Sequence, residues 1–171
     1  MSVAEPAVLE SAANVPTMSE PAFSVAELPA PRRVAIATLF GEILATEREL
    51  AAMYAAAAQR TPIAHLRTAF AEFAETKRRR VEALTRLAPL LVPEAGDGDV
   101  APGPRGTSPA LPERRSDVFA RAFEAERALE VAYREVLALL GDPGRSPELA
   151  TLAGGSARHR ALLRDLYLRY S

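Results

Sequence analysis

The chain has 171 residues, the length of one domain with extra segments, and its 49% hydrophobic and 25% charged residues are typical of a folded protein. It contains no cysteine, which excludes disulfides, thiolate nucleophiles, iron–sulfur clusters and cysteine-bound zinc. Its 21 basic and 22 acidic residues nearly cancel, and no run of about 18 apolar residues occurs. We therefore expect a soluble, cytoplasmic protein that binds neither nucleic acid nor membranes.

Residues 1–31 form an acidic tail that is rich in alanine and proline and has no basic residue. Its apolar residues are too few and too irregular to pack a core, so the tail is predicted to be disordered. It contains the sequence Phe23-Ser24-Val25-Ala26-Glu27-Leu28, which resembles the docking peptides of encapsulin cargo proteins. The resemblance implies a shell protein as partner; the alternative is an incidental apolar patch.

The remainder, residues 32–171, is predicted to be one helical domain. Apolar residues recur with helical spacing over 32–59, 62–88, 113–141 and 146–170. Short turns with proline or glycine separate the members of each pair, which predicts two antiparallel hairpins. Between the pairs lies a proline- and glycine-rich linker, 89–112, long enough to run the length of a helix. These features predict an all-α four-helix bundle with a crossover connection.

The two halves of the domain resemble each other. Glu47 precedes Tyr54 by seven residues in the first helix, and Glu126 precedes Tyr133 by seven in the third. Seven residues are two helical turns, so each glutamate shares a face with its tyrosine. A duplicated helical hairpin is the simplest explanation.

Polar side chains interrupt the apolar face near the middle of every predicted helix. They are Glu47, Lys77 with Arg80 one turn later, Glu126, and Ser156 with His159 one turn later. An ionised side chain in an apolar core costs several kcal/mol unless it is paired or binds a metal. Either Lys77 and Arg80 neutralise the two glutamates, or Glu47, Glu126 and His159 coordinate a metal, since carboxylate and imidazole suit iron, manganese or zinc.

The helix order, the long linker and the repeated Glu…Tyr pattern resemble the ferritin-like superfamily, in its rubrerythrin-type branch. In that family the first and third helices each give a glutamate, and the second and fourth each give a Glu-x-x-His pair, for two metals. Glu47 and Glu126 match the single glutamates. In Ser156-Ala157-Arg158-His159 only the histidine is kept, and in Lys77-Arg78-Arg79-Arg80 neither ligand is. The resemblance therefore implies a degenerate dimetal site.

We accordingly expect a bundle that has lost dimetal chemistry, needs no cofactor, is not an enzyme, and acts in binding or assembly as a homo-oligomer. In that case Lys77, Arg80 and Ser156 form a charge-compensating core. One alternative is an iron- or manganese-binding redox protein, of ferroxidase or rubrerythrin type, with the reduced metal site Glu47, Glu126 and His159. Another is compartment cargo directed by residues 1–31.

Two adjacent glycines, Gly154 and Gly155, stand in the fourth predicted helix, where each costs about 1 kcal/mol relative to alanine. They predict close helix contact or a local bend. The alternative is that they leave space for a ligand beside Ser156 and His159.

Overall fold

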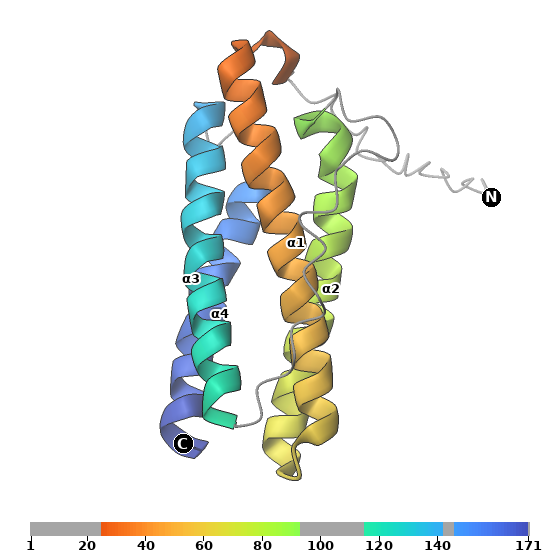
Figure 1. The fold of residues 1–171 in the computed structure, drawn as a ribbon, viewed down its shortest axis with the longest axis vertical. Coiled ribbons are helices and arrows are strands. Elements are labelled where there is room, and N and C mark those ends of the chain that lie inside the picture. Colours follow the sequence, from red (N-terminus) through yellow and green to blue (C-terminus); the bar gives the residue numbers. More distant parts are fainter. Residues whose placement is uncertain (1–24, 93–114, 142–145, 171) are drawn as a thin grey trace, which may run out of the picture.

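The computed structural model describes residues 25–92, 115–141 and 146–170, and every regular element within these ranges is helical. A short 3-10 helix, η1 (Val25–Glu27), precedes four long helices: α1 (Ala30–Arg60), α2 (Ala64–Leu91), α3 (Arg115–Leu140) and α4 (Pro147–Tyr170). The four helices pack lengthwise against one another (Figure 1), which confirms the predicted all-α four-helix bundle. None of the described helices is both long and apolar enough to cross a bilayer.

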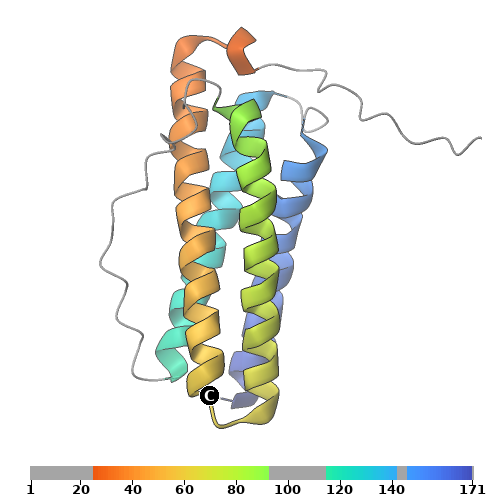
Figure 2. The same cartoon turned by 90° about the vertical axis from the view of Figure 1, so that its right-hand side faces the viewer.

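The helices form two antiparallel hairpins, α1 with α2 and α3 with α4, and the backbones also approach closely between α1 and α3. Helix α2 ends at one end of the bundle and α3 begins at the other, as the two views in Figures 1 and 2 show. The connection between the hairpins therefore joins opposite ends of the bundle, as a crossover requires. Residues 93–114, which hold most of the predicted linker 89–112, lie outside the described residues.

The observed helix bounds lie within three residues of the predicted ones, and two of the differences involve proline. Helix α1 begins at Ala30 rather than after Pro31, because proline is tolerated in a first turn, where its missing N–H would have no partner. Helix α2 continues through Pro89, the predicted start of the linker, and ends at Leu91. The side chain of Leu91 is only 5% exposed, so its burial holds the last turn in place beyond the proline.

The predicted tail boundary at residue 31 is also wrong. Val25 and Leu28 are buried in the core, and Arg33 Nη1 donates a hydrogen bond to the carbonyl oxygen of Leu28 at 3.2 Å. The segment from Val25 onward therefore belongs to the folded bundle, while residues 1–24 of the predicted tail lie outside the described residues.

The hairpin between α3 and α4 is capped at both helix ends. Gly141 follows α3 with φ of +82°, a left-handed conformation that favours glycine, and its N–H bonds to the carbonyls of Leu137 and Ala138. At the start of α4, Ser146 Oγ accepts a hydrogen bond from the Leu149 N–H at 3.4 Å.

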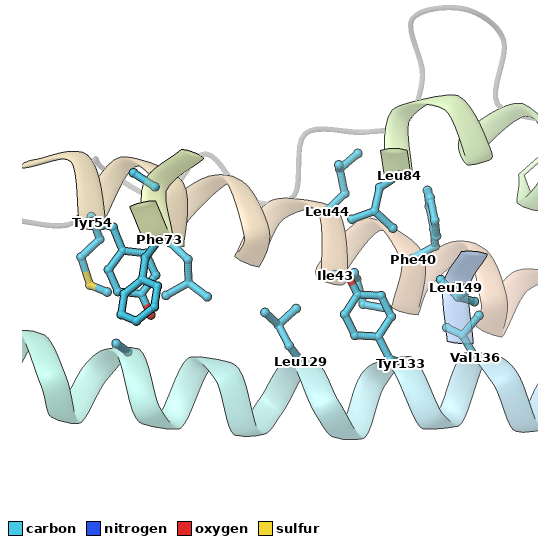
Figure 3. Close-up of a cluster of buried hydrophobic side chains, with 14 of the residues drawn as sticks. Phe40, Ile43, Leu44, Tyr54, Phe73, Leu84, Leu129, Tyr133, Val136 and Leu149 are labelled. Carbon is cyan, nitrogen blue, oxygen red and sulfur yellow. The ribbon is translucent and has the colours of Figure 1, made fainter. Parts of the chain in front are cut away.

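The hydrophobic core runs along the whole bundle between the helices. Figure 3 shows apolar and aromatic side chains from α1, α2, α3 and α4 meeting in this space, among them Phe40, Tyr54, Phe73, Tyr133 and Leu149. Each comes from a row of residues three and four apart, which is the spacing that places side chains on one face of a helix. This core surrounds the polar residues described next.

Candidate functional site

All six polar residues singled out in the sequence are buried in the bundle. Glu47, Lys77, Glu126 and Ser156 have no exposed surface, and Arg80 and His159 are 7% and 8% exposed. Each lies in the apolar row of its own helix, so the turn-by-turn spacing that buries the neighbouring leucines and aromatics buries these residues too. All four helices thus contribute to one buried polar cluster.

The ammonium group of Lys77 lies between the two glutamates. Its Nζ is 2.8 Å from Glu47 Oε2 and 2.8 Å from Glu126 Oε1. The attraction in a buried ion pair offsets the cost of removing both charges from water only where the geometry is close and further hydrogen bonds satisfy the remaining polar atoms. One lysine on α2 therefore links a carboxylate of α1 to a carboxylate of α3.

Arg80 neutralises the remaining negative charge and connects the cluster to α4. Its Nη1 lies 3.1 Å from Glu47 Oε1 and donates a hydrogen bond to Ser156 Oγ at 3.0 Å. Lys77 and Arg80 each carry one positive charge, and Glu47 and Glu126 each carry one negative charge. The formal charge of these four residues therefore sums to zero.

Gly155 provides the space that the Arg80 side chain needs. A Cβ atom at Gly155 would lie 1.9 Å from Arg80 Nη2, whereas a Cβ at Gly154 would meet no atom within 4 Å. The guanidinium group of Arg80 therefore occupies the volume beside Gly155, for which the sequence suggested either a close helix contact or a bound ligand.

The two tyrosines of the repeated pattern behave differently. Tyr133 on α3 donates a hydrogen bond from its hydroxyl to Glu47 Oε1 on α1, at 3.0 Å. Tyr54 is fully buried, but its hydroxyl makes no hydrogen bond to any described residue. Burial, together with the negative charges of Glu126 and Glu47, raises the pKa of Tyr54 well above its usual value, so the phenol stays protonated.

His159 completes the cluster on the side of Glu126. Its Nδ1 lies 3.2 Å from Glu126 Oε1, and its ring packs 5.1 Å from the ring of Phe73. Burial alone would raise the pKa of Glu126, but the hydrogen bond from His159 and the charge of Lys77 outweigh it and hold that pKa below its usual value. Glu126 is therefore an ionised carboxylate at neutral pH.

The arrangement does not suit a metal ion. The Lys77 ammonium lies within contact of both carboxylates that would serve as ligands, where its positive charge would repel a cation. Within the described ranges, no three carboxylate or imidazole side chains are grouped so that they could hold a metal. His159 contacts Glu126, but Lys77 rather than an ion joins Glu126 to Glu47.

A third buried acid, Glu130, was not identified from the sequence. It is 6% exposed, contacts Arg134 one turn along α3, and lies 2.8 Å from Arg160 Nη1 on α4. Glu130 follows Glu126 by four residues and precedes Tyr133 by three, so helical spacing places it on the same face of α3 as these two buried residues. This spacing is the one sequence signal that could have indicated its burial.

An apolar groove lies near the end of the bundle where α3 begins and α4 ends. Its volume is about 480 Å³, and Phe119, Phe123, Leu163 and Tyr167 line it, with Glu124 and Arg164 among the charged residues beside them. The groove is separate from the buried cluster and opens to the surface of the α3–α4 hairpin.

The segment that resembles a cargo docking peptide lies partly within the fold. Val25 is 1% exposed and Leu28 is 9% exposed, so these two apolar residues pack against the bundle. They would have to leave the core to bind another protein. Phe23 and Ser24 lie outside the described residues.

Comparison of the chain with protein-family models, with curated proteins and with solved structures finds no match in any of the three.

Proposed function

We propose that this chain is a ferritin-like bundle that has lost dimetal chemistry and acts in binding or assembly without a metal cofactor. The observation that carries the proposal is the position of Lys77, with its ammonium 2.8 Å from Glu47 Oε2 and 2.8 Å from Glu126 Oε1. In a ferritin-like site, metal ions would lie between carboxylates from these two helices. Here a side chain of the protein supplies the positive charge instead.

The substitutions at the other ligand positions support the same conclusion. Arg80 stands where the second helix of the family has its histidine, and its guanidinium neutralises Glu47. Ser156 stands where the fourth helix has its glutamate, and it accepts a hydrogen bond from Arg80. The replacements thus contact one another, which is the pattern expected when a metal site becomes a charge-compensated core.

Metal analysis of the full-length chain, purified without chelator and then dialysed against iron or manganese, tests this proposal. We expect less than a stoichiometric amount of either metal. About one tightly held transition metal per chain, lost in the His159→Ala variant, would overturn the proposal in favour of a redox protein using Glu47, Glu126 and His159.

A triple variant provides the matched control. Lys77→Glu, Arg80→His and Ser156→Glu together would restore a carboxylate or imidazole at every family position while keeping the backbone of the bundle. We expect this variant to bind divalent metal and the wild-type chain not to. A triple variant that folds but binds no metal would show that these positions do not correspond to the family site.

The α3–α4 surface supports a role in assembly, and we propose a second copy of this chain as its partner. Leu162, Tyr167 and Leu168 on α4 are 45%, 43% and 67% exposed, and the apolar groove lies beside them. Glu124 and Arg164 carry opposite charges at the groove, so two copies related by a two-fold axis could pair one with the other.

Light scattering of the purified chain, combined with size-exclusion chromatography, tests the assembly. We expect a dimer or larger oligomer that dissociates in the Leu168→Glu variant. Val34→Glu is the matched control, because Val34 is an apolar residue with nearly the same exposure, 66%, but lies on α1, outside the proposed interface. A monomeric wild-type chain, or equal dissociation in both variants, contradicts this interface.

A further inference from the structure

Lys77 and Glu47 are held in a geometry that suits a covalent reaction between them. Both side chains have no exposed surface, and Lys77 Nζ is 2.8 Å from Glu47 Oε2. Neither of these two atoms has the alignment of a hydrogen bond to any described residue. Since a carbon–oxygen bond is about 1.2 Å long, the nitrogen lies within roughly 4 Å of the carboxyl carbon, whereas reacting atoms in a near-attack arrangement are about 3–3.5 Å apart.

The other oxygen of Glu47 faces two hydrogen-bond donors. Glu47 Oε1 accepts from Tyr133 OH at 3.0 Å and from Arg80 Nη1 at 3.1 Å. Two donors on one carboxyl oxygen polarise the carbon and stabilise the negative charge that this oxygen gains when a nucleophile adds. This is a preorganised oxyanion site inside the bundle.

A second carboxylate lies on the far side of the nucleophile. Glu126 Oε1 is 2.8 Å from Lys77 Nζ, and Glu126 Oε2 makes no hydrogen bond within the described part of the chain. A carboxylate in direct contact with an amine can accept its proton and return it to a leaving group. Nucleophile, electrophile, oxyanion donors and proton carrier thus come together from three helices.

We propose that Lys77 Nζ and Glu47 Cδ condense to form an isopeptide bond that links α2 to α1. Glu126 first takes a proton from the ammonium of Lys77 and passes it to Glu47 Oε2. The free nitrogen then adds to Cδ, and Arg80 and Tyr133 hold the negative charge on Oε1. The nitrogen loses a second proton through Glu126 to Oε2, the bond from Cδ to Oε2 breaks, and one molecule of water leaves with an amide in place.

The interior of the bundle favours this product. The reaction replaces a buried ammonium and a buried carboxylate by one neutral amide, which removes two charges that are costly to keep out of water. Arg80 and Glu126 remain with one charge of each sign. The reacting groups are fixed by four packed helices, so little orientational freedom has to be lost before the bond forms.

Denatured intact mass measurement of the full-length chain tests the proposal. We expect a mass lower than that of the sequence by one water molecule. Because Lys77 is the only lysine in the chain, an amine-reactive reagent should then label the denatured chain at its N-terminal amine alone. A chain with the full sequence mass and a reactive Lys77 overturns the proposal.

Peptide mapping separates the isopeptide from other losses of water, such as cyclisation of Asp97-Gly98. Trypsin should leave Lys77 uncut and release residues 34–48 joined to residues 68–78. A water loss that maps to Asp97, with these two peptides separate, overturns the proposal.

Two variants test the roles within the reaction. Lys77→Met should have its full sequence mass, and Glu126→Gln should show a strongly reduced linked fraction, measured at matched times after purification. Should Glu126→Gln link as completely as the wild-type chain, the proton transfer assigned to Glu126 is wrong. None of these masses depends on metal binding or on oligomeric state, so failure here leaves the proposed function to be judged by its own experiments.

Discussion

The single lysine of the chain shows how one side chain can satisfy two buried carboxylates in a helical bundle. A buried ammonium and a divalent cation both satisfy carboxylates that would otherwise be unpaired, but the ammonium is covalently attached to α2 and has one fixed position. Lys77 contacts Glu47 on α1 and Glu126 on α3. Because removing one partner of a buried ion pair leaves an uncompensated charge, Lys77 and its two glutamates are expected to depend strongly on one another.

The two tyrosines of the repeated pattern give a matched pair of variants. In chains whose Lys77 and Glu47 are not linked, Tyr133→Phe removes a hydrogen bond to the ionised Glu47 carboxylate, so we expect it to lower the free energy of unfolding, relative to the unlinked wild-type chain, by about 1.5–3 kcal/mol, the usual value for a bond to a charged group. Tyr54→Phe removes a buried hydroxyl that has no hydrogen-bond partner among the described residues, so we expect no loss of stability or a small gain.

Urea unfolding of both variants, followed by circular dichroism, measures the difference. The two substitutions remove the same atom from equally buried side chains, so hydrophobic contributions cancel in the comparison. Equal effects of the two variants would contradict the different hydrogen bonding of Tyr54 and Tyr133.

At the scale of the helices, the sequence was sufficient for their number, order and approximate bounds. Helical periodicity and proline or glycine breaks are local properties, so both can be identified directly from the amino-acid sequence. The errors occurred where tertiary packing outweighs a local breaker. Pro89 remains inside α2 because the buried Leu91 anchors the last turn, and η1 forms because Val25 packs in the core.

The buried cluster was predictable in its members but not in its contacts. Spacing along a helix determines which face a residue occupies, so Glu47, Lys77 and Glu126 could be placed in the core from the sequence. Spacing says nothing of the rotation and height of one helix relative to another. The bond from Tyr133 to Glu47 and the ion pair of Glu130 with Arg160 depend on that relative placement, and both needed the structure.

Alanine substitutions at the two adjacent glycines of α4 are expected to have opposite effects on the free energy of unfolding. Gly155→Ala would place a methyl group 1.9 Å from Arg80 Nη2, and Arg80 is held there by Glu47 and Ser156, so the variant should be destabilised by about 1–3 kcal/mol. Gly154→Ala meets no atom within 4 Å and lies within a helix, so it should be stabilised by up to about 1 kcal/mol.

Thermal or urea unfolding of the two alanine variants tests this difference in sign. Arg80→Ala together with Gly155→Ala provides a further control, because the added methyl group then has no guanidinium to displace. The interpretation of Gly155 as space for Arg80 is wrong if Gly155→Ala is as stable as Gly154→Ala.

On the scale of the whole molecule, the buried cluster holds the two hairpins together. The α1–α2 hairpin supplies Glu47, Lys77 and Arg80, and the α3–α4 hairpin supplies Glu126 and Tyr133, which bind partners in the first. Separation of the hairpins would break the ion pair of Lys77 with Glu126 and the hydrogen bond of Tyr133 with Glu47. Pairing of the hairpins and burial of charge are therefore coupled, which makes the stability of the entire bundle sensitive to the ionisation of its carboxylates.

Acidification should consequently weaken the bundle as a unit. In the chain whose Lys77 is an unlinked ammonium, the hydrogen bond from His159 and the charge of Lys77 hold the pKa of Glu126 below its usual 4.5 in spite of burial, so the folded chain keeps this carboxylate ionised where the unfolded chain takes up a proton. A lowered pKa contributes stability that is present above pH 4.5 and is lost as the pH falls through the folded value. Urea midpoints should therefore fall steeply below about pH 4.5. In Glu126→Gln, which is less stable at neutral pH, that fall should be shallower, and an identical slope in the two proteins would contradict the assignment to Glu126.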